Sequence, residues 1–245
     1  MSDHHIVSAF DNDLKDLAGK IAEMGGLAEQ LVDQSITSLL RSDVQMAKRV
    51  IKQDITINII QQEIEEKAVL TIARRQPMAG DLREIIAALR ISGDLERIGD
   101  LGKNIAKRVI RLEGQVQPKE LVHGLETVAK LALEQMKAIL DAYANADAEM
   151  AVQIRDRDDE IDNLYMALFR DLLEYMMKDP RNITYCTHLL FCAKNIERIG
   201  DHVTNVAETI HYFVTGDQMV RETRRTSETH DSDGVLIERP LSDNN

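Results

Sequence analysis

The sequence contains no tryptophan, only four prolines and two cysteines, and aromatic residues make up 4% of its 245 positions. β-Sheet proteins use more aromatic, β-branched and turn-forming residues than this, so the scarcity argues against strands. Leucine, isoleucine, alanine, glutamate and lysine are abundant instead, and we expect an all-α protein. The two cysteines, Cys186 and Cys192, lie in an apolar stretch and are expected to be buried thiols.

Long apolar runs and net positive charge are also missing. No stretch of about 20 apolar residues occurs, and the N-terminus lacks the basic and apolar regions of a signal peptide. We therefore expect a cytoplasmic protein with at most peripheral membrane association. A net charge of −12 argues against nucleic-acid binding and suits cations or basic partners. The GxxxxGK[ST], GxGxxG, HExxH and GxSxG motifs are absent, and we expect no enzymatic activity.

The chain repeats itself. Residues 94–106 read DLERIGDLGKNIA, and residues 195–207 read NIERIGDHVTNVA, so the pentapeptide ERIGD occurs twice at a separation of 101 residues. Upstream of these segments the halves match at a separation of 104 residues, as with Asp54 and Asp158. A length change confined to one turn is what a structural repeat tolerates.

Apolar periodicity and chain breakers predict three helices in each half. Their expected ranges are Asp11 or Asp13 to Leu40, from Ser42-Asp43 to Gln76-Pro77, Leu82–Glu113 with Asp81 as cap, Val128–Tyr143, Ala146–Met177 and Ile183–Val214. The expected units are a first three-helix repeat at 1–113, a linker at 114–124 that contains Pro118, a second repeat at 125–215 and a disordered polar tail at 216–245.

Each ERIGD segment places oxygen-bearing side chains along one side of its helix. Residues four apart lie on the same face, so each half has a strip with this spacing. The strips are Glu96, Asp100 and Asn104 in the first half and Glu197, Asp201 and Asn205 in the second. A helical wheel points them away from the apolar residues of the same helices, so packing does not require them.

A second acidic pair is expected to face each strip. If the second and third helices of each half are antiparallel, these pairs lie level with the ERIGD acids. They are Asp54 with Asn58 in the first half and Asp158 with Asp162 in the second. Four oxygen-bearing side chains without cysteine suit magnesium, manganese, calcium or carboxylate-bridged iron. The alternative is a solvated acidic face, because carboxylates four residues apart are common in so acidic a chain.

Two further motifs keep an enzymatic or storage alternative open. Glu120 with His123, and Glu208 with His211, have the Glu-x-x-His spacing of di-iron helical bundles, as in an oxidase or a ferritin-like metal store. The two motifs are not related by the repeat, which weakens this alternative. Gly99 and Gly200 cost helix stability, so their recurrence indicates a close helix approach or room for a ligand.

These features together resemble the PhoU family of phosphate-signalling regulators. The resemblance rests on the two three-helix repeats, the turn RQPMAGDLR at 75–83 and the paired ERIGD motifs, and it extends to about residue 215. It implies six helices in two tandem pseudo-symmetric three-helix bundles, often assembled as a homodimer. It also implies a negative regulator of phosphate uptake and of the phosphate-starvation response, which links the phosphate ABC transporter with its ATPase to a sensor histidine kinase.

The resemblance also implies metal clusters at the acid-x-x-x-Asp motifs. The bound ions are then divalent or ferric: iron, manganese, magnesium or zinc. Glu96, Asp100, Glu197 and Asp201 match the ligand motif directly, and Asp158 with Asp162 matches its partner. Asn58 departs from the family pattern beside Asp54, so the first site is expected to bind metal less tightly.

Overall fold

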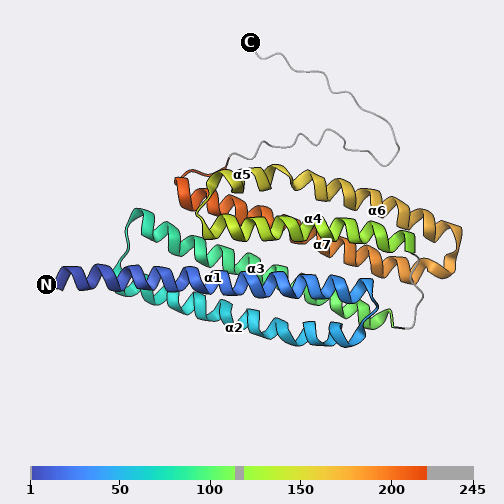
Figure 1. The fold of residues 1–245 in the computed structure, drawn as a ribbon, viewed down its shortest axis with the longest axis horizontal. Coiled ribbons are helices and arrows are strands. Elements are labelled where there is room, and N and C mark those ends of the chain that lie inside the picture. Colours follow the sequence, from blue (N-terminus) through green and yellow to red (C-terminus); the bar gives the residue numbers. More distant parts are fainter. Residues whose placement is uncertain (1, 114–118, 220–245) are drawn as a thin grey trace, which may run out of the picture.

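The computed structural model describes residues 2–113 and 119–219, and every regular element in these ranges is a helix. The elements are α1 (Ser2–Leu40), α2 (Val44–Arg75), α3 (Ala79–Arg111), α4 (Lys119–Ala144), α5 (Ala148–Asp156), α6 (Asp158–Lys178), the 3-10 turn η1 (Pro180–Asn182) and α7 (Ile183–Thr215). Helices α1 to α3 form one bundle, and α4, α5 with α6, and α7 form a second one beside it (Figure 1). The predicted all-α fold of two tandem pseudo-symmetric three-helix bundles is confirmed.

Both bundles start their second helix with the same cap. The Asp43 carboxylate accepts a hydrogen bond from the backbone N–H of Met46 at 2.8 Å, and that of Asp147 accepts one from Met150 at 2.9 Å. Such caps satisfy backbone N–H groups that have no partner within the helix. The predicted break at Ser42-Asp43 is therefore confirmed, and the second bundle repeats it.

Two predicted helix starts are wrong. Helix α1 begins at Ser2 and not at Asp11 or Asp13, and the Asp13 carboxylate pairs with Arg75 of α2 at 3.1 Å instead of capping a helix. Helix α3 begins at Ala79, so Asp81 lies in its first turn and is not its cap. An acidic side chain in the first turn still interacts favourably with the helix dipole.

The start of the fourth helix is also earlier than predicted. Helix α4 begins at Lys119 rather than Val128, so residues 119–124 of the expected linker are helical. A proline before the first helical residue does not oppose a helix that begins after it, which the sequence-based boundary overlooked. The remaining linker residues 114–118, and residues 220–245 of the expected tail, lie outside the described residues.

The predicted fifth helix, Ala146–Met177, is interrupted at Arg157, which divides it into α5 and α6. The side chain of Gln135 is buried, and its amide donates a hydrogen bond to the Arg157 carbonyl at 3.2 Å. The matching residue of the first bundle is Leu31, whose apolar side chain has no group that needs a hydrogen-bond acceptor. A buried amide that needs an acceptor therefore accompanies the interruption in one bundle only.

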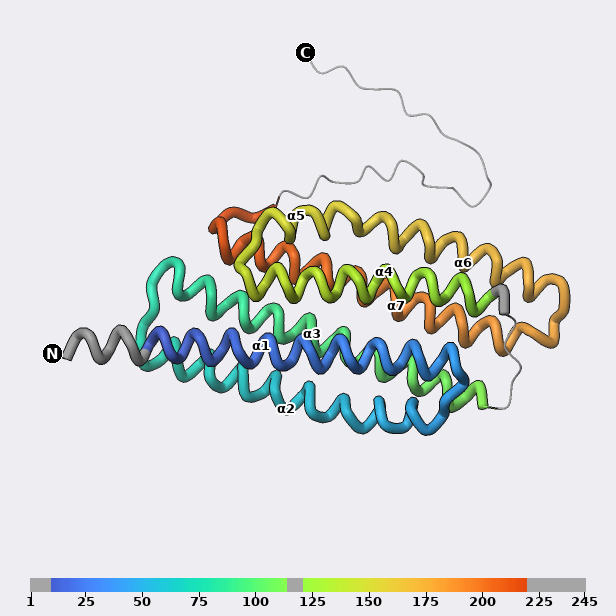
Figure 2. Tube along the Cα trace, viewed as in Figure 1, coloured from blue at the N-terminus to red at the C-terminus, as the bar shows by residue number. Residues whose placement is uncertain are grey.

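The bundles meet along α3 and α7, which run in opposite directions (Figures 1 and 2). Near one end the guanidinium of Arg90 lies 5.8 Å from the centre of the Tyr212 ring. Near the other, Arg108 lies 4.2 Å from the centre of the Phe191 ring. One continuous hydrophobic core extends through both bundles, so the repeats form a single packed unit.

Glycines allow the close approach of helices inside each bundle. A Cβ atom added at Gly99 would lie 2.8 Å from Ile57 Cδ1, and one at Gly200 would lie 2.8 Å from Ile161 Cδ1. Of the two explanations for the repeated glycine, the structure supports close approach. Helix α1 is continuous through Gly25, where an added Cβ would meet the Leu140 side chain of α4. Within residues 2–113 and 119–219, no helix has the length and hydropathy to cross a membrane.

Candidate metal centre

The acidic residues of the second bundle come together where α6 crosses α7. Asp162 of α6 and Glu197 and Asp201 of α7 each have one carboxylate oxygen within 4.8 Å of the others. In the described part of the chain this is the only such group of three or more His, Cys, Asp or Glu residues. Three carboxylates at this separation form an oxygen-rich set that suits a hard cation.

Glu197 is the deepest member of this group. Only 8% of the residue is exposed, and its Oε2 atom has no hydrogen-bond partner among the described residues. Burial and the neighbouring Asp201 and Asp162 carboxylates raise the pKa of Glu197 above its ordinary value, although Lys194 acts in the opposite direction. A buried carboxylate oxygen without a partner costs about 1–3 kcal/mol, so it calls for a positive ligand.

This burial corrects, for Glu197, the expectation that the acidic strips point away from packed side chains. Asp54 on α2 and Glu197 on α7 are both buried, because the neighbouring helix of each bundle covers them. A helical wheel describes a single helix and cannot show which polar face a second helix covers. The alternative of a solvated acidic face is therefore wrong for these two residues.

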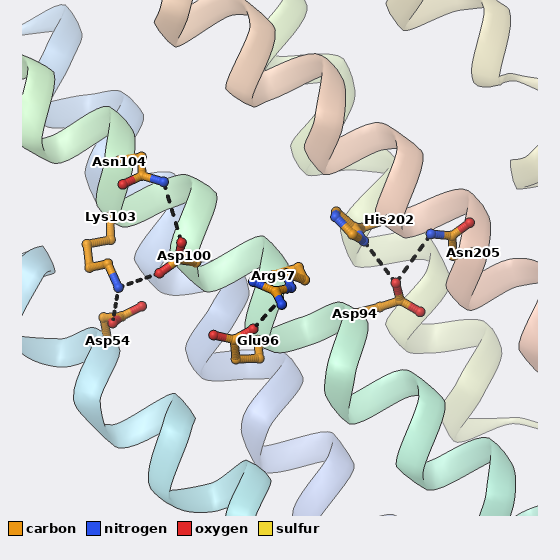
Figure 3. Close-up of polar contacts among 9 residues, drawn as sticks. All are labelled: Asp54, Asp94, Glu96, Arg97, Asp100, Lys103, Asn104, His202 and Asn205. Carbon is orange, nitrogen blue, oxygen red and sulfur yellow. Dashed lines mark hydrogen bonds and ion pairs between the residues drawn. The ribbon is translucent and has the colours of Figure 1, made fainter.

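In the first bundle, a lysine lies between the predicted ligands. Lys103 Nζ contacts Asp54 Oδ2 at 2.7 Å and also contacts Asp100, so it ties α2 to α3 (Figure 3). Asn104 donates to the Asp100 carboxylate at 3.5 Å, and Glu96 lies 3.6 Å from the Arg97 guanidinium. The ammonium of Lys103 thus lies between the Asp54 and Asp100 carboxylates. Asn58 is half-buried on the same helix as Asp54.

The other predicted ligands of the second bundle have different contacts. Asp158 accepts a hydrogen bond from the Thr204 hydroxyl at 3.2 Å. Asn205 is turned toward the first bundle, where its amide donates to Asp94 at 3.3 Å (Figure 3). His202 also contacts Asp94, at 2.9 Å, so it is a partnered histidine at the α3–α7 boundary. The strips therefore contribute to inter-bundle packing as well as to the candidate metal centre.

Sequence reasoning missed three residues that contact the acids of these sites. Lys103 and Thr204 occupy matching positions of the two repeats, and Lys194 contacts the Glu197 carboxylate from one turn earlier in α7. A position-by-position comparison of the repeats would have found the exchange of lysine for threonine. The spacing of acids alone could not show it, because the contacts cross between helices.

The di-iron alternative receives no support from the described geometry. His123 is exposed and lies 4.0 Å from Glu126, and His211 contacts the backbone carbonyl of Asp217 at 3.1 Å. Neither histidine belongs to the carboxylate group of Asp162, Glu197 and Asp201. The chain therefore offers an all-oxygen set without imidazole ligands.

Comparisons with known proteins agree with the two-bundle fold. The model of the PhoU domain matches the chain twice, at residues 21–109 and 125–210, so it covers each bundle once. The chain belongs to the PhoU family. A PhoU homolog from Rhizobium meliloti, described as a phosphate-specific transport system accessory protein, is 60% identical over 218 residues, covering 89% of this chain and 92% of the relative.

More distant PhoU proteins and solved PhoU structures show the same similarity. The Escherichia coli phosphate-specific transport system accessory protein PhoU is 37% identical over 212 residues, covering 86% of this chain and 88% of its own. The crystal structure of PhoU from Pseudomonas aeruginosa matches with a TM-score of 0.81 at 35% identity, covering 85% of this chain and 100% of its own. For the phosphate transport system regulatory protein PhoU from Streptococcus pneumoniae, the TM-score is 0.80 at 30% identity, covering 86% and 99%. Membership of the PhoU family supports a role in phosphate transport.

Proposed function

We propose that this chain is a metal-binding negative regulator of phosphate uptake and of the phosphate-starvation response. It acts as an adaptor between the phosphate ABC transporter, through its ATPase, and the sensor histidine kinase of the phosphate system. Its activity is binding to partners and not turnover of a substrate. Its cytoplasmic location and its assembly as a homodimer remain predictions that follow from the sequence and the family resemblance.

The names of the relatives support the transport half of this proposal. The Rhizobium meliloti and Escherichia coli relatives are described as accessory proteins of the phosphate-specific transport system, and the Streptococcus pneumoniae protein as a regulatory one. These descriptions concern the relatives themselves. The high identity and nearly complete coverage are the reason for proposing the same system for this chain.

The observation that carries the metal-binding half is the unpartnered Oε2 atom of Glu197. This oxygen is buried next to Asp201 and Asp162, so three carboxylates converge at this point of the second bundle. Lys194 contacts only the other oxygen of Glu197 and is itself half-exposed. The donor set therefore fits a hard cation held by Asp162, Glu197 and Asp201.

These ligands also explain how metal could control docking. Asp162 belongs to α6 and the other two ligands to α7, so a cation bound by all three would hold the two helices in register. A bound cation supplies the positive charge that offsets their mutual repulsion. The order of the α6–α7 face then decides whether this surface can complement a basic or polar surface of a partner.

The test replaces the natural protein with variants and measures a reporter that is driven by a phosphate-starvation promoter in phosphate-rich medium. Glu197→Gln combined with Asp201→Asn removes two ligands while it keeps side-chain size and hydrogen-bonding capacity. We expect the purified variant to have lost its metal by elemental analysis and the reporter to be derepressed. Glu174→Gln, which changes an exposed carboxylate of α6, is the matched control and should repress normally. Normal repression by a folded but metal-free Glu197→Gln/Asp201→Asn variant would contradict the mechanism.

A further inference from the structure

Matching positions of the two repeats make the same contact with different chemistry. Asp54 in α2 corresponds to Asp158 in α6, and Lys103 in α3 corresponds to Thr204 in α7. The first pair is an ion pair at 2.7 Å, and the second is a hydrogen bond from a neutral hydroxyl at 3.2 Å. The repeat has therefore kept the contact between its second and third helices while exchanging a cation for an uncharged group.

Lys103 is well placed to act as a built-in cation. Its side chain is 18% exposed, that of Asp54 is 6% exposed, and the ammonium also contacts Asp100. Lysine is protonated at neutral pH because its ordinary pKa is about 10.4. The ammonium is therefore charged at neutral pH, and it offsets the two carboxylates that a metal would otherwise bind.

The charge balance of the two strips differs in a second way. Asn58 lies where the second half has Asp162, so the first site has one carboxylate fewer. Each site has one lysine in contact with its acids, but only Lys103 contacts acids on two helices. A divalent cation entering the first strip would have to displace Lys103 from a largely buried position or remain close to a like charge. In the second strip, Thr204 presents no such charge to an incoming cation.

Lys194 of the second bundle does not take the place of Lys103. It contacts Glu197 from one turn earlier in the same helix, and 48% of its side chain is exposed. Its ammonium lies 5.4 Å from the centre of the Tyr165 ring, and it leaves Glu197 Oε2 without a partner. It therefore does not close the second strip, whereas Lys103 bridges carboxylates on two helices.

We propose that the two repeats neutralise the same acidic motif in two ways: Lys103 permanently closes the first strip to metal, and only the second strip takes up a divalent cation. This inference deepens the metal-binding part of the proposed function and rests on it. The ion pairs of Lys103 then join α2 to α3 whether or not metal is present, whereas the contact between the acids of α6 and α7 depends on bound metal. The second bundle is the metal-responsive half of the protein.

The experiment measures Mn²⁺ bound to the full-length protein by equilibrium dialysis and elemental analysis, with circular dichroism to confirm folding. The first-strip variant is Glu96→Gln/Asp100→Asn, and the second-strip variant is Asp162→Asn/Asp201→Asn. We expect the first-strip variant to bind as much Mn²⁺ as the wild type and the second-strip variant to lose it. Retention of Mn²⁺ by the second-strip variant, or its loss from the first-strip variant, would overturn the inference.

Reciprocal exchanges test Lys103 directly. Asn58→Asp with Lys103→Thr, placed in the second-strip variant, gives the first strip the residues of the second and is expected to restore Mn²⁺ binding. Thr204→Lys in the wild type is expected to abolish binding.

Failure of the Asn58→Asp/Lys103→Thr exchange to restore Mn²⁺ binding overturns the inference. If the wild type binds no Mn²⁺, the proposed metal-dependent function fails. A gain of Mn²⁺ by the Asn58→Asp/Lys103→Thr protein would then still support exclusion by Lys103, and the absence of a gain would refute it.

Discussion

The charge of each buried acidic side chain is balanced by only a few neighbouring residues. Glu197 lies buried beside two other carboxylates and its Oε2 atom has no partner among the described residues, whereas Asp54 of the first bundle pairs with the Lys103 ammonium. Two exchanges between the repeats, Lys103 for Thr204 and Asn58 for Asp162, therefore accompany the different charge balance of the two sites. Removing one partner from a buried ion pair costs more than the pair contributes, so such positions are sensitive to single substitutions.

The two cysteines allow a prediction at this same scale. Cys186 and Cys192 are fully buried, and burial raises the pKa of both thiols, that of Cys192 to about 12. Because the thiolate is the reactive form, we expect native protein to react very slowly with a disulfide reagent at pH 8. Protein unfolded in guanidinium should expose two fast-reacting thiols and serves as the control. Rapid labelling of both thiols in native protein would contradict the burial.

At the scale of the helices, small residues set how closely the elements approach. A Cβ atom added at Gly102 of α3 would lie 2.6 Å from Leu31 Cδ2 and 3.4 Å from Val32 Cγ2, so α1 packs directly against this position. In the second bundle the residue that matches Gly102 is Val203, and the residue that matches Leu31 is Gln135. The repeats therefore fill equivalent space with different pairs of side chains.

This packing predicts opposite effects for two substitutions in one helix. Gly102→Ala is expected to destabilise the protein by about 1–3 kcal/mol, because the added methyl group overpacks the contact with α1. Gly93→Ala should stabilise it by roughly 1 kcal/mol, since nothing lies within 4 Å of the new Cβ and alanine favours the helix. Denaturant unfolding of both variants measures the difference. A stabilising Gly102→Ala would show that α1 and α3 are less tightly packed than described.

At the scale of the whole molecule, the antiparallel α3 and α7 join the bundles. Asp94 of α3 accepts hydrogen bonds from His202 and Asn205 of α7, near the middle of this contact (Figure 3). Both members of the Asp94–His202 pair have less than a fifth of their side chains exposed. The polar contact therefore lies within the boundary between the bundles and fixes how they align.

A double-mutant cycle on this pair tests its part in joining the bundles. For Asp94→Ala, His202→Ala and the double variant, we expect a coupling free energy of roughly 1 kcal/mol in denaturant unfolding. The exposed His123–Glu126 pair of α4 is the matched control, and its coupling should be close to zero. Equal coupling in the two cycles would mean that the Asp94 contact adds nothing to inter-bundle packing.

Much of the fold and part of the site followed from the sequence by itself. The shortage of aromatic, proline and cysteine residues and the duplicated ERIGD determined the all-α class, the two repeats and the facing acidic strips, because composition and helical periodicity are local properties of the chain. Helix starts at Ser2 and Lys119 could not be predicted, since capping-capable residues near a boundary need not be caps.

Only the tertiary structure decided which acids are buried and which cation balances them. Lys103 of α3 pairs with Asp54 of α2, and Gln135 of α4 donates to the Arg157 carbonyl between α5 and α6. Asn205 of α7 donates to Asp94 of α3 in the other bundle. Each of these contacts joins residues that are 22 to 111 positions apart in the chain. Burial and charge balance at such sites depend on how helices pack together, and a pattern within one helix contains no information about its neighbour.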